Sequence, residues 1–232
     1  MKPTALVLYR GRSLFTGQLI EAVAVNSNGN RKTGAMVGVF IQPAANVAKA
    51  VRPHPSVCPD ACAFRDAGGC YVNWAWGPRS VQVAHSGRPV CKPAEAREFA
   101  RDRMVRLGQA GDPAAIPVHV WRKLLTHAAG WTGYTHAWRS RPSLRGLCMA
   151  SVESHVDAEE AEARGWRAYR VRPRGTDTIY GEIDCPSAVV QCADCGLCTG
   201  AGGKAASAPS ISIPAHGGAV AARVSDRIAI GV

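Results

Sequence analysis

Four cysteines near the end of the chain form its most chemically informative motif. They are Cys185, Cys192, Cys195 and Cys198, in the run DCPSAVVQCADCGLC. Two overlapping Cys-x-x-Cys steps place three thiols on one tight loop, and the Cys-Pro step supplies a fourth. Structural zinc sites usually draw a ligand pair from each of two separate knuckles, whereas bacterial ferredoxins combine steps of three with a Cys-Pro. The spacing predicts a closed structural metal site that favours a 4Fe-4S iron–sulfur cluster, with zinc as the alternative and disulfides or loose thiols as the third interpretation.

A second cysteine group lies upstream, in VCPDACAFRDAGGCYV, and contains Cys58, Cys62 and Cys70. The glycine pair at 68–69 lets the backbone turn tightly enough to bring the last thiol back toward the first two. Three local thiols leave one coordination position for Cys91, Cys148, a histidine or an exogenous ligand. An open position is what separates a catalytic metal site from a structural one, so we expect the functional metal- or cofactor-binding site here. Cys148, in the apolar run GLCMAS, is more typical of a buried core thiol.

The cysteine count and the apolar pattern indicate a reducing compartment. Nine cysteines is an odd number, and the first twenty residues lack a usable signal sequence because two arginines interrupt the apolar run. No stretch approaches the roughly 18 apolar residues of a membrane span. We therefore expect a cytoplasmic protein with no membrane contact, where clustered cysteines indicate metal binding or catalysis more often than disulfides.

Basic residues outnumber acidic ones, giving a formal net charge of +11, and they are unevenly placed. No acidic residue lies between Asp112 and Glu153. The interval from Trp121 to Arg145 mixes cations with aromatic rings: Trp121, Arg122, Lys123, Trp131, Tyr134, Trp138, Arg139, Arg141 and Arg145. Such a mixture can bind a phosphate backbone and stack on bases, which predicts contact with nucleic acid or with a phosphate-bearing small molecule. The alternative is that the tryptophans are core residues and the arginines form a solvated face.

The elements that must position these residues alternate between strand and helix. We expect strands at 36–43, 105–112, 131–138, 144–152, 166–173, 181–185 and 210–214, and helices at 93–106, 118–129 and 157–164. Repeated strand–helix alternation predicts an α/β fold with a largely parallel sheet, either open or closed into a partial or full (β/α) barrel. The predicted organisation is one domain over 1–216, with a basic N-terminal segment 1–35 and a peripheral tail 217–232.

Ligands of such folds gather at the carboxyl ends of the strands, where the acid–base candidates also fall. These are Asp112, His136 and Glu153. Each has a structural alternative: a lone histidine is usually a hydrogen-bonded structural group, Asp112 before a proline caps a helix, and Glu153 begins the turn before a helix.

Five segments together look like a group of cysteine-rich proteins of tailed bacteriophages: CPDACAFRDAGGCY, GDPAAIP, GWTGYTHAWR, LCMASVES and CPSAVVQCADCGLC. The resemblance covers about residues 25–216. That group is in turn similar to compact radical-SAM barrels, in which a three-cysteine loop after the first strand holds an iron–sulfur cluster. The resemblance implies that Cys58, Cys62 and Cys70 bind the cluster, that the downstream four form an auxiliary site, and that S-adenosylmethionine (SAM) is a further cofactor. The Cys-x3-Cys-x7-Cys spacing departs from the x3, x2 spacing of those barrels.

Two functions compete at this point. The first is a metal-dependent enzyme whose upstream loop activates a ligand and which acts on a nucleotide or nucleic acid. The second is a non-catalytic module in which the metal centres are structural and the surface binds nucleic acid or a host protein. The identity of the metal discriminates between them.

Overall fold

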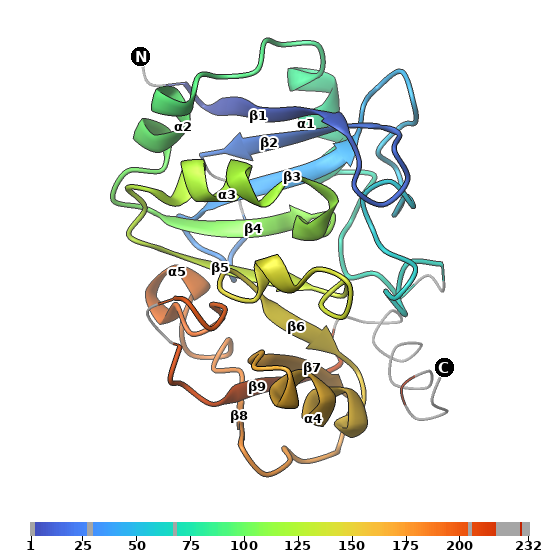
Figure 1. The fold of residues 1–232 in the computed structure, drawn as a ribbon, viewed down its shortest axis with the longest axis vertical. Helices are drawn as coiled ribbons and strands as arrows, with labels where there is room; N and C mark the ends of the chain where they lie inside the picture. The colour runs from blue at the N-terminus through green and yellow to red at the C-terminus, as the bar shows by residue number, and fades with distance from the viewer. Residues whose placement is uncertain (1–2, 27–29, 67–68, 204–205, 217–227, 229–232) are drawn as a thin grey trace.

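A nine-stranded sheet runs through the protein in the computed structural model, which describes residues 3–26, 30–66, 69–203, 206–216 and 228 (Figure 1). The spatial order is β1-β2-β3-β4-β5-β6-β7-β9-β8. The strands are β1 (Ala5–Arg12), β2 (Leu19–Val25), β3 (Val37–Pro43), β4 (Met104–Ala110), β5 (Gly130–Thr135), β6 (Met149–Val152), β7 (Ala168–Arg172), β8 (Glu182–Asp184) and β9 (Ser210–Pro214). Of the described pairings, β2 runs antiparallel to β1 and β3, and the remaining pairs are parallel. The predicted α/β class with a largely parallel sheet is confirmed.

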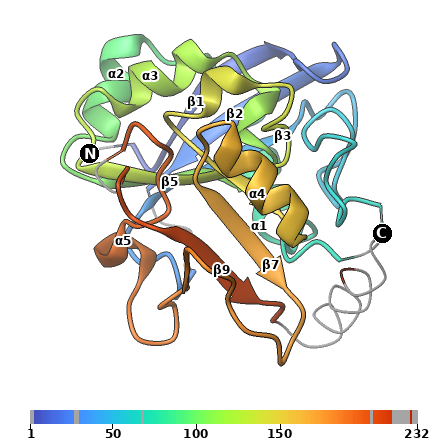
Figure 2. The same cartoon turned by 60° about the horizontal axis from the view of Figure 1, so that its bottom comes forward.

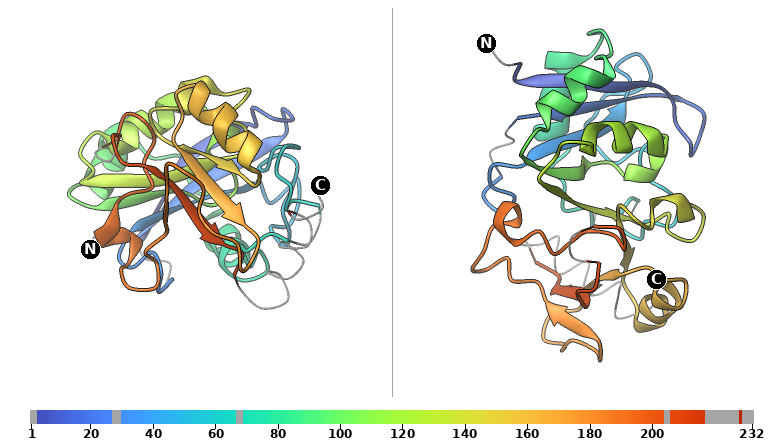
Figure 3. Two further views of the ribbon diagram at one scale, coloured as in Figure 1. Left: turned by 90° about the horizontal axis from the view of Figure 1, so that it is seen from below. Right: turned by 60° about the vertical axis from the view of Figure 1, so that its left-hand side comes forward.

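Helices cover the sheet on both sides, as βα crossovers require. They are α1 (Gly77–His85), α2 (Pro93–Phe99), α3 (Val118–Leu125), α4 (His155–Ala163) and the single turn α5 (Cys192–Cys195), with 3-10 turns at η1 (Pro113–Ala115) and η2 (Pro142–Leu144). Helices α2, α3 and α4 lie over one face of the curved sheet, while α1 and α5 lie on the other side (Figures 2 and 3). Among the described residues no pairing joins β1 to β8 at the two ends of the sheet.

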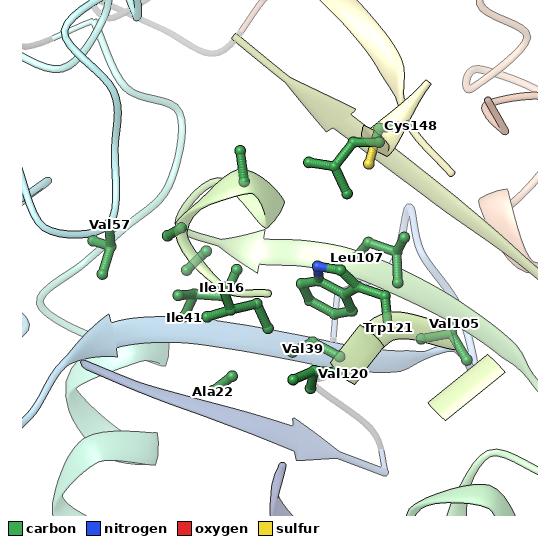
Figure 4. Close-up of a cluster of buried hydrophobic side chains, with 14 of the residues drawn as sticks. Ala22, Val39, Ile41, Val57, Val105, Leu107, Ile116, Val120, Trp121 and Cys148 are labelled. Carbon is green, nitrogen blue, oxygen red and sulfur yellow. The ribbon is translucent and has the colours of Figure 1, made fainter. Parts of the chain in front are cut away.

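The main core lies between α3 and the first parallel strands (Figure 4). Trp121 of α3 is completely buried, packs beside Leu107 and Val105 of β4, and donates its indole N–H to the carbonyl of Pro113 at 3.0 Å. On β3 every residue is buried, which matches the continuous apolar run expected of a strand covered on both faces. One face of the sheet is therefore filled by side chains of its helices.

Several element boundaries differ from those expected. The strand predicted over 144–152 begins only at Met149, and the one predicted over 131–138 ends at Thr135. The helix predicted over 93–106 ends at Phe99, because Asp102 takes a left-handed φ of 56° and Met104 already belongs to β4. The helix predicted to continue to 129 ends at Leu125. Helix α4 is capped by Ser154, whose hydroxyl accepts from the Asp157 amide at 3.0 Å, so Asp157 is inside the helix rather than at its cap.

The ends of the chain also bear on the expected organisation. The N-terminal segment 1–35 contains β1 and β2, which pair with β3 and extend the sheet, so it is an integral part of the fold. Most of the tail 217–232 lies outside the described residues. Its one described residue, Ile228, packs against the small cluster formed by Phe64 and Ala215. None of the helices in the described part is long and apolar enough to cross a membrane.

Candidate metal centre and cavity

A cavity of about 240 Å³ lies on one side of the sheet. Alternating strand residues line it, among them Arg106 of β4, Tyr134 of β5 and Tyr169 of β7. Successive side chains of a strand point to opposite faces, so the residues between them belong to the core that the helices cover. The two tyrosine rings lie against each other with centroids 4.1 Å apart. The sheet thus leaves one face hollow, with polar side chains inside it.

The upstream cysteine loop closes one end of this cavity, with Cys58, Cys62 and Cys70 all among the lining residues. The Asp112 amide donates to the Val57 carbonyl at 2.7 Å, and Arg65 donates to the Cys58 carbonyl at 3.2 Å, so the loop is fastened to the end of β4 and to itself. Gly68 of the predicted tight turn lies outside the described residues.

The environment of these thiols opposes their ionisation without a cation. Burial, followed by the charges of Cys62 and Cys70, raises the pKa of Cys58 well above its usual value. Burial also raises the pKa of Cys70, although the neighbouring indole of Trp74 acts in the opposite direction. Thiolates are the form that binds metal, so a bound cation would supply the charge that this site lacks.

The three predicted acid–base residues lie close together next to this loop. His136 Nε2 lies 3.0 Å from Glu153 Oε1, and the two side chains are 18% and 16% exposed. Burial alone would lower the pKa of His136, but the charges of Cys62 and Glu153 outweigh it and hold that pKa well above its usual range. His136 lines the cavity beside the cysteine loop, so the His136–Glu153 pair can reach a ligand there.

Asp112 has a different role. Its Oδ1 accepts from the Ala114 amide at 2.8 Å and from the Thr135 hydroxyl at 2.7 Å, and its Oδ2 accepts from the His136 amide at 2.9 Å. Burial raises its pKa, while those three hydrogen bonds act to lower it. The carboxylate caps η1 and fixes the backbone of His136, which is the capping role that the Asp-Pro sequence offered as its alternative.

The structure separates the candidates for a fourth ligand. Cys148 is completely buried, and a Cβ added at Gly133 of β5 would lie 3.1 Å from its sulfur, so it belongs to the core as the apolar run indicated. Cys91 follows α1 and donates its amide to the Val7 carbonyl at 2.8 Å. Neither is among the described residues that line the cavity, whereas His136 is. His136 is therefore the protein side chain best placed to complete the upstream group.

The downstream cysteines surround a second, very small hollow of about 10 Å³. Cys185, Cys192, Cys195 and Cys198 all line it. The loop turns sharply after α5, because Gly196 takes a left-handed φ of 63° and donates its amide to the Cys192 carbonyl at 3.1 Å. Burial raises the pKa of Cys198 to about 12, against the effect of the Tyr134 hydroxyl beside it. The four thiols line one hollow, but among the described residues they are not grouped closely enough to form a metal site as they stand.

One buried arginine holds the downstream loop in place. Arg167 is 6% exposed and donates to four backbone carbonyls at 2.7 to 2.8 Å. The acceptors are Leu197, Thr199, Ala208 and Pro209. The side chain thus ties the residue before Cys198 and the residue after it to the start of β9.

The described thiols stand too far apart to bind one ion as they are placed. Within the described ranges, no three His, Cys, Asp or Glu side chains are grouped so that they could hold a metal ion. Four thiolates on a single zinc lie about 3.8 Å apart, given a Zn–S bond of about 2.3 Å and tetrahedral geometry. Thiol is the donor type that both a zinc ion and an iron–sulfur cluster take.

The basic, aromatic interval is folded inward. Trp121 and Trp138 are buried, at 0% and 2% exposure, and Trp131 is partly buried with its N–H donated to the Leu147 carbonyl at 2.9 Å. Arg139 forms ion pairs with Asp157 and Glu160 of α4. These residues therefore follow the alternative interpretation, in which the tryptophans belong to the core and the arginines lie on the surface. Tyr134 of the same interval lines the cavity.

Two important cavity residues carry little signal in the sequence and were not predicted. Arg106 is a lone cation in the strand MVRLGQA, and Trp74 follows the upstream loop with a buried N–H that has no hydrogen-bond acceptor among the described residues. Arg106 could have been found from the sequence, because it is a charged residue within a largely apolar strand. Nothing in the sequence distinguished Trp74 from a core residue.

No family model, no curated protein and no solved structure matches this chain.

Proposed function

We propose that this chain is a metal-dependent enzyme that binds a 4Fe-4S cluster through Cys58, Cys62 and Cys70, and that it acts on a nucleotide or a related phosphate-bearing molecule. One observation carries the proposal: the three thiols and His136, whose Nε2 contacts Glu153, line one cavity at the ends of parallel strands. The upstream loop supplies three thiols to the cavity, so the fourth position on a cluster would be left for His136 or for an exogenous ligand. SAM is a further cofactor that such an open iron would suit, and zinc is the alternative metal.

The chain's own residues have distinct roles in this proposal. The His136–Glu153 pair can hold and transfer a proton next to the loop, and Asp112 positions His136 through its amide. Trp74 brings its indole N–H beside Cys70, and hydrogen bonds to cluster sulfur are among the features that set cluster potential.

The downstream cysteines suit a closed, structural centre. Four thiols line one hollow, so the protein would supply a full ligand set there. Arg167 already immobilises the loop through its carbonyls, which is what a structural centre requires. We propose that this centre stabilises the C-terminal part of the sheet.

The second candidate function is a metal-stapled binding module without catalysis. It is favoured by the geometry of α5, because a Cys-x-x-Cys on one turn followed by a left-handed glycine is compatible with half of a zinc site. Under this function the cavity would be a recognition site and the protein would be colourless with zinc at both cysteine groups.

Anaerobic purification followed by iron, sulfide and zinc analysis tests the proposal. We expect a brown protein with equal amounts of iron and acid-labile sulfide. Cys62→Ser should remove the upstream share of the iron, whereas Cys91→Ser is the matched control, because Cys91 is a partly buried cysteine that is not among the described residues lining the cavity.

Two results would contradict the proposal. Zinc without iron in the anaerobic preparation would favour the binding module. Loss of iron in Cys91→Ser, with none in Cys62→Ser, would show that the cavity is not where the cluster binds.

A further inference from the structure

A buried cation lies in the cavity without an acidic partner among the described residues. Arg106 is 8% exposed, and its guanidinium lies 4.2 Å from the centre of the Tyr134 ring. The guanidinium also makes a long contact of 3.4 Å to the Thr132 hydroxyl. A guanidinium has five N–H donors, so much of its donor capacity is unused by the described protein groups.

Two arginines farther along the sheet, on β7, are paired differently. Arg170 of β7 forms a two-pronged ion pair with Glu182 at 2.7 and 2.8 Å, and Arg172 pairs with Asp184. A buried charge is costly unless it is paired and hydrogen-bonded. The contrast marks Arg106 as the arginine whose partner is supplied from outside the fold.

The charges around the cavity favour an anion. Among its described lining residues the only acidic side chain is Asp112, whose oxygens already accept three hydrogen bonds, while Lys32 adds a second cation at the edge. Burial alone would lower the pKa of Arg106, but Tyr134, Tyr71 and Cys198 outweigh it and raise that pKa, so the guanidinium is charged. Arg106 is therefore a buried cation without a carboxylate partner among the described residues that line the cavity.

A second polar group in the cavity also lacks a partner. The side-chain Oε1 of Gln109 is buried and has no hydrogen-bond donor among the described residues, and Gln109 lines the same cavity. An amide oxygen accepts from O–H or N–H groups. A ligand with an anionic group and a hydroxyl or amino group would satisfy both residues at once.

We propose that Arg106 is the anion-binding residue of this cavity, and that the ligand is a small molecule carrying a phosphate or carboxylate group. Guanidinium groups bind both oxyanions through paired hydrogen bonds. The cavity, at about 240 Å³, is slightly smaller than the roughly 300–1,000 Å³ of ordinary ligand sites, so it suits a small molecule rather than a folded nucleic acid. The inference rests on the proposed function for what happens to the ligand, and it names the ligand's chemical class.

Calorimetric titration of the anaerobically purified, metal-loaded protein tests this inference at constant ionic strength. The probes are inorganic phosphate, AMP and succinate. We expect at least one to bind, with phosphate and AMP identifying a phosphate ligand and succinate a carboxylate ligand. Arg106→Lys should bind at least about tenfold more weakly, because an ammonium lacks the planar paired donors, and Arg106→Gln should not bind detectably.

Arg122→Gln is the matched control, since it removes the same charge from an exposed position on α3 and should leave affinity unchanged. Should Arg106→Gln fail to fold, the charge-conserving Arg106→Lys still decides the matter. Wild-type protein that contains iron but binds none of the probes would overturn the inference and leave the metal proposal intact. Probe binding by protein without iron would support Arg106 and refute the cluster. A third result would also overturn the inference: the wild-type protein binds no anion, and Arg106→Gln loses the downstream metal. Arg106 would then be only a counter-ion to the downstream thiols.

Discussion

Asp112 shows how one side chain can organise a site without taking part in its chemistry. Its carboxylate caps η1, and its Oδ2 holds the amide of His136 at 2.9 Å. Its own amide also fastens the upstream cysteine loop through the Val57 carbonyl. The chain reaches this position through Gly111, which takes a left-handed φ of 76°. The turn at Gly111 therefore controls where both the histidine and the cysteine loop lie.

Gly111→Ala should destabilise the protein strongly. An added Cβ would lie 2.4 Å from the Ile41 carbonyl oxygen, which belongs to the backbone of β3. Gly175→Ala is the matched control, because Gly175 has the same φ of 76° and nothing within 4 Å of an added Cβ. Both variants should lose about 1–2 kcal/mol through the left-handed conformation, and we expect Gly111→Ala to lose about 1–3 kcal/mol more through forced backbone shifts. Urea unfolding measures both, and equal losses would contradict the close packing at Gly111.

Among the elements, the two cysteine loops differ in how completely they supply ligands. The upstream loop places three thiols at the cavity beside His136, whereas the downstream loop places four around its own small hollow. Arg167 ties the downstream loop to the start of β9 through four carbonyls. The downstream loop is thus restrained by Arg167, and two of its cysteines, Cys185 and Cys192, also line the larger cavity.

Cys195→Ser should therefore act on stability more than on the upstream centre. Cys195 lies at the end of α5 and lines the downstream hollow. Because metal binding at a closed site contributes directly to folding, we expect the variant to lose one metal centre and to melt at a lower temperature. Its upstream share of iron should remain, in contrast to Cys62→Ser. Metal analysis and thermal unfolding measure both effects. Full metal content with an unchanged melting temperature would exclude a downstream centre.

For the whole molecule, the net charge of +11 is the feature that acts at long range. Trp121 and Trp138 are packed inside the fold, so they are not placed to stack on bases. Any attraction for a polyanion would come from the surface cations and from counterion release. Binding of this kind has little base preference.

We expect single-stranded and duplex DNA to bind with similar affinities that fall steeply as salt increases. Replacing Arg139, Arg141 and Arg145 with glutamine should flatten the salt dependence, because each phosphate that the protein no longer neutralises keeps its counterions. Fluorescence anisotropy over a range of salt concentrations measures this. No binding at low salt, or a slope that the triple variant leaves unchanged, would remove nucleic acid from the partners of this surface.

Local signals in the chain were enough to predict the class of the fold. Strand β3, strand β7 and helix α4 follow from apolar runs, alternation and start signals, each of which is contained in a short segment. The spacing of Cys192 and Cys195 likewise places two thiols on the single turn α5 through local geometry. The hairpin of β1 and β2 was missed as part of the sheet, because its pairing with β3 is a long-range choice.

The contents of the cavity, in contrast, depend on which strands become neighbours. The parallel strands bring Arg106, Tyr134 and His136 to one hollow face, although they come from different strands and loops of the chain. The order of the strands decides that His136 lies beside Glu153 and near Cys62. It also decides that Arg106 is buried without a carboxylate partner among the described residues. Strand order is set by packing across the whole sheet, and no short segment of the chain contains that information.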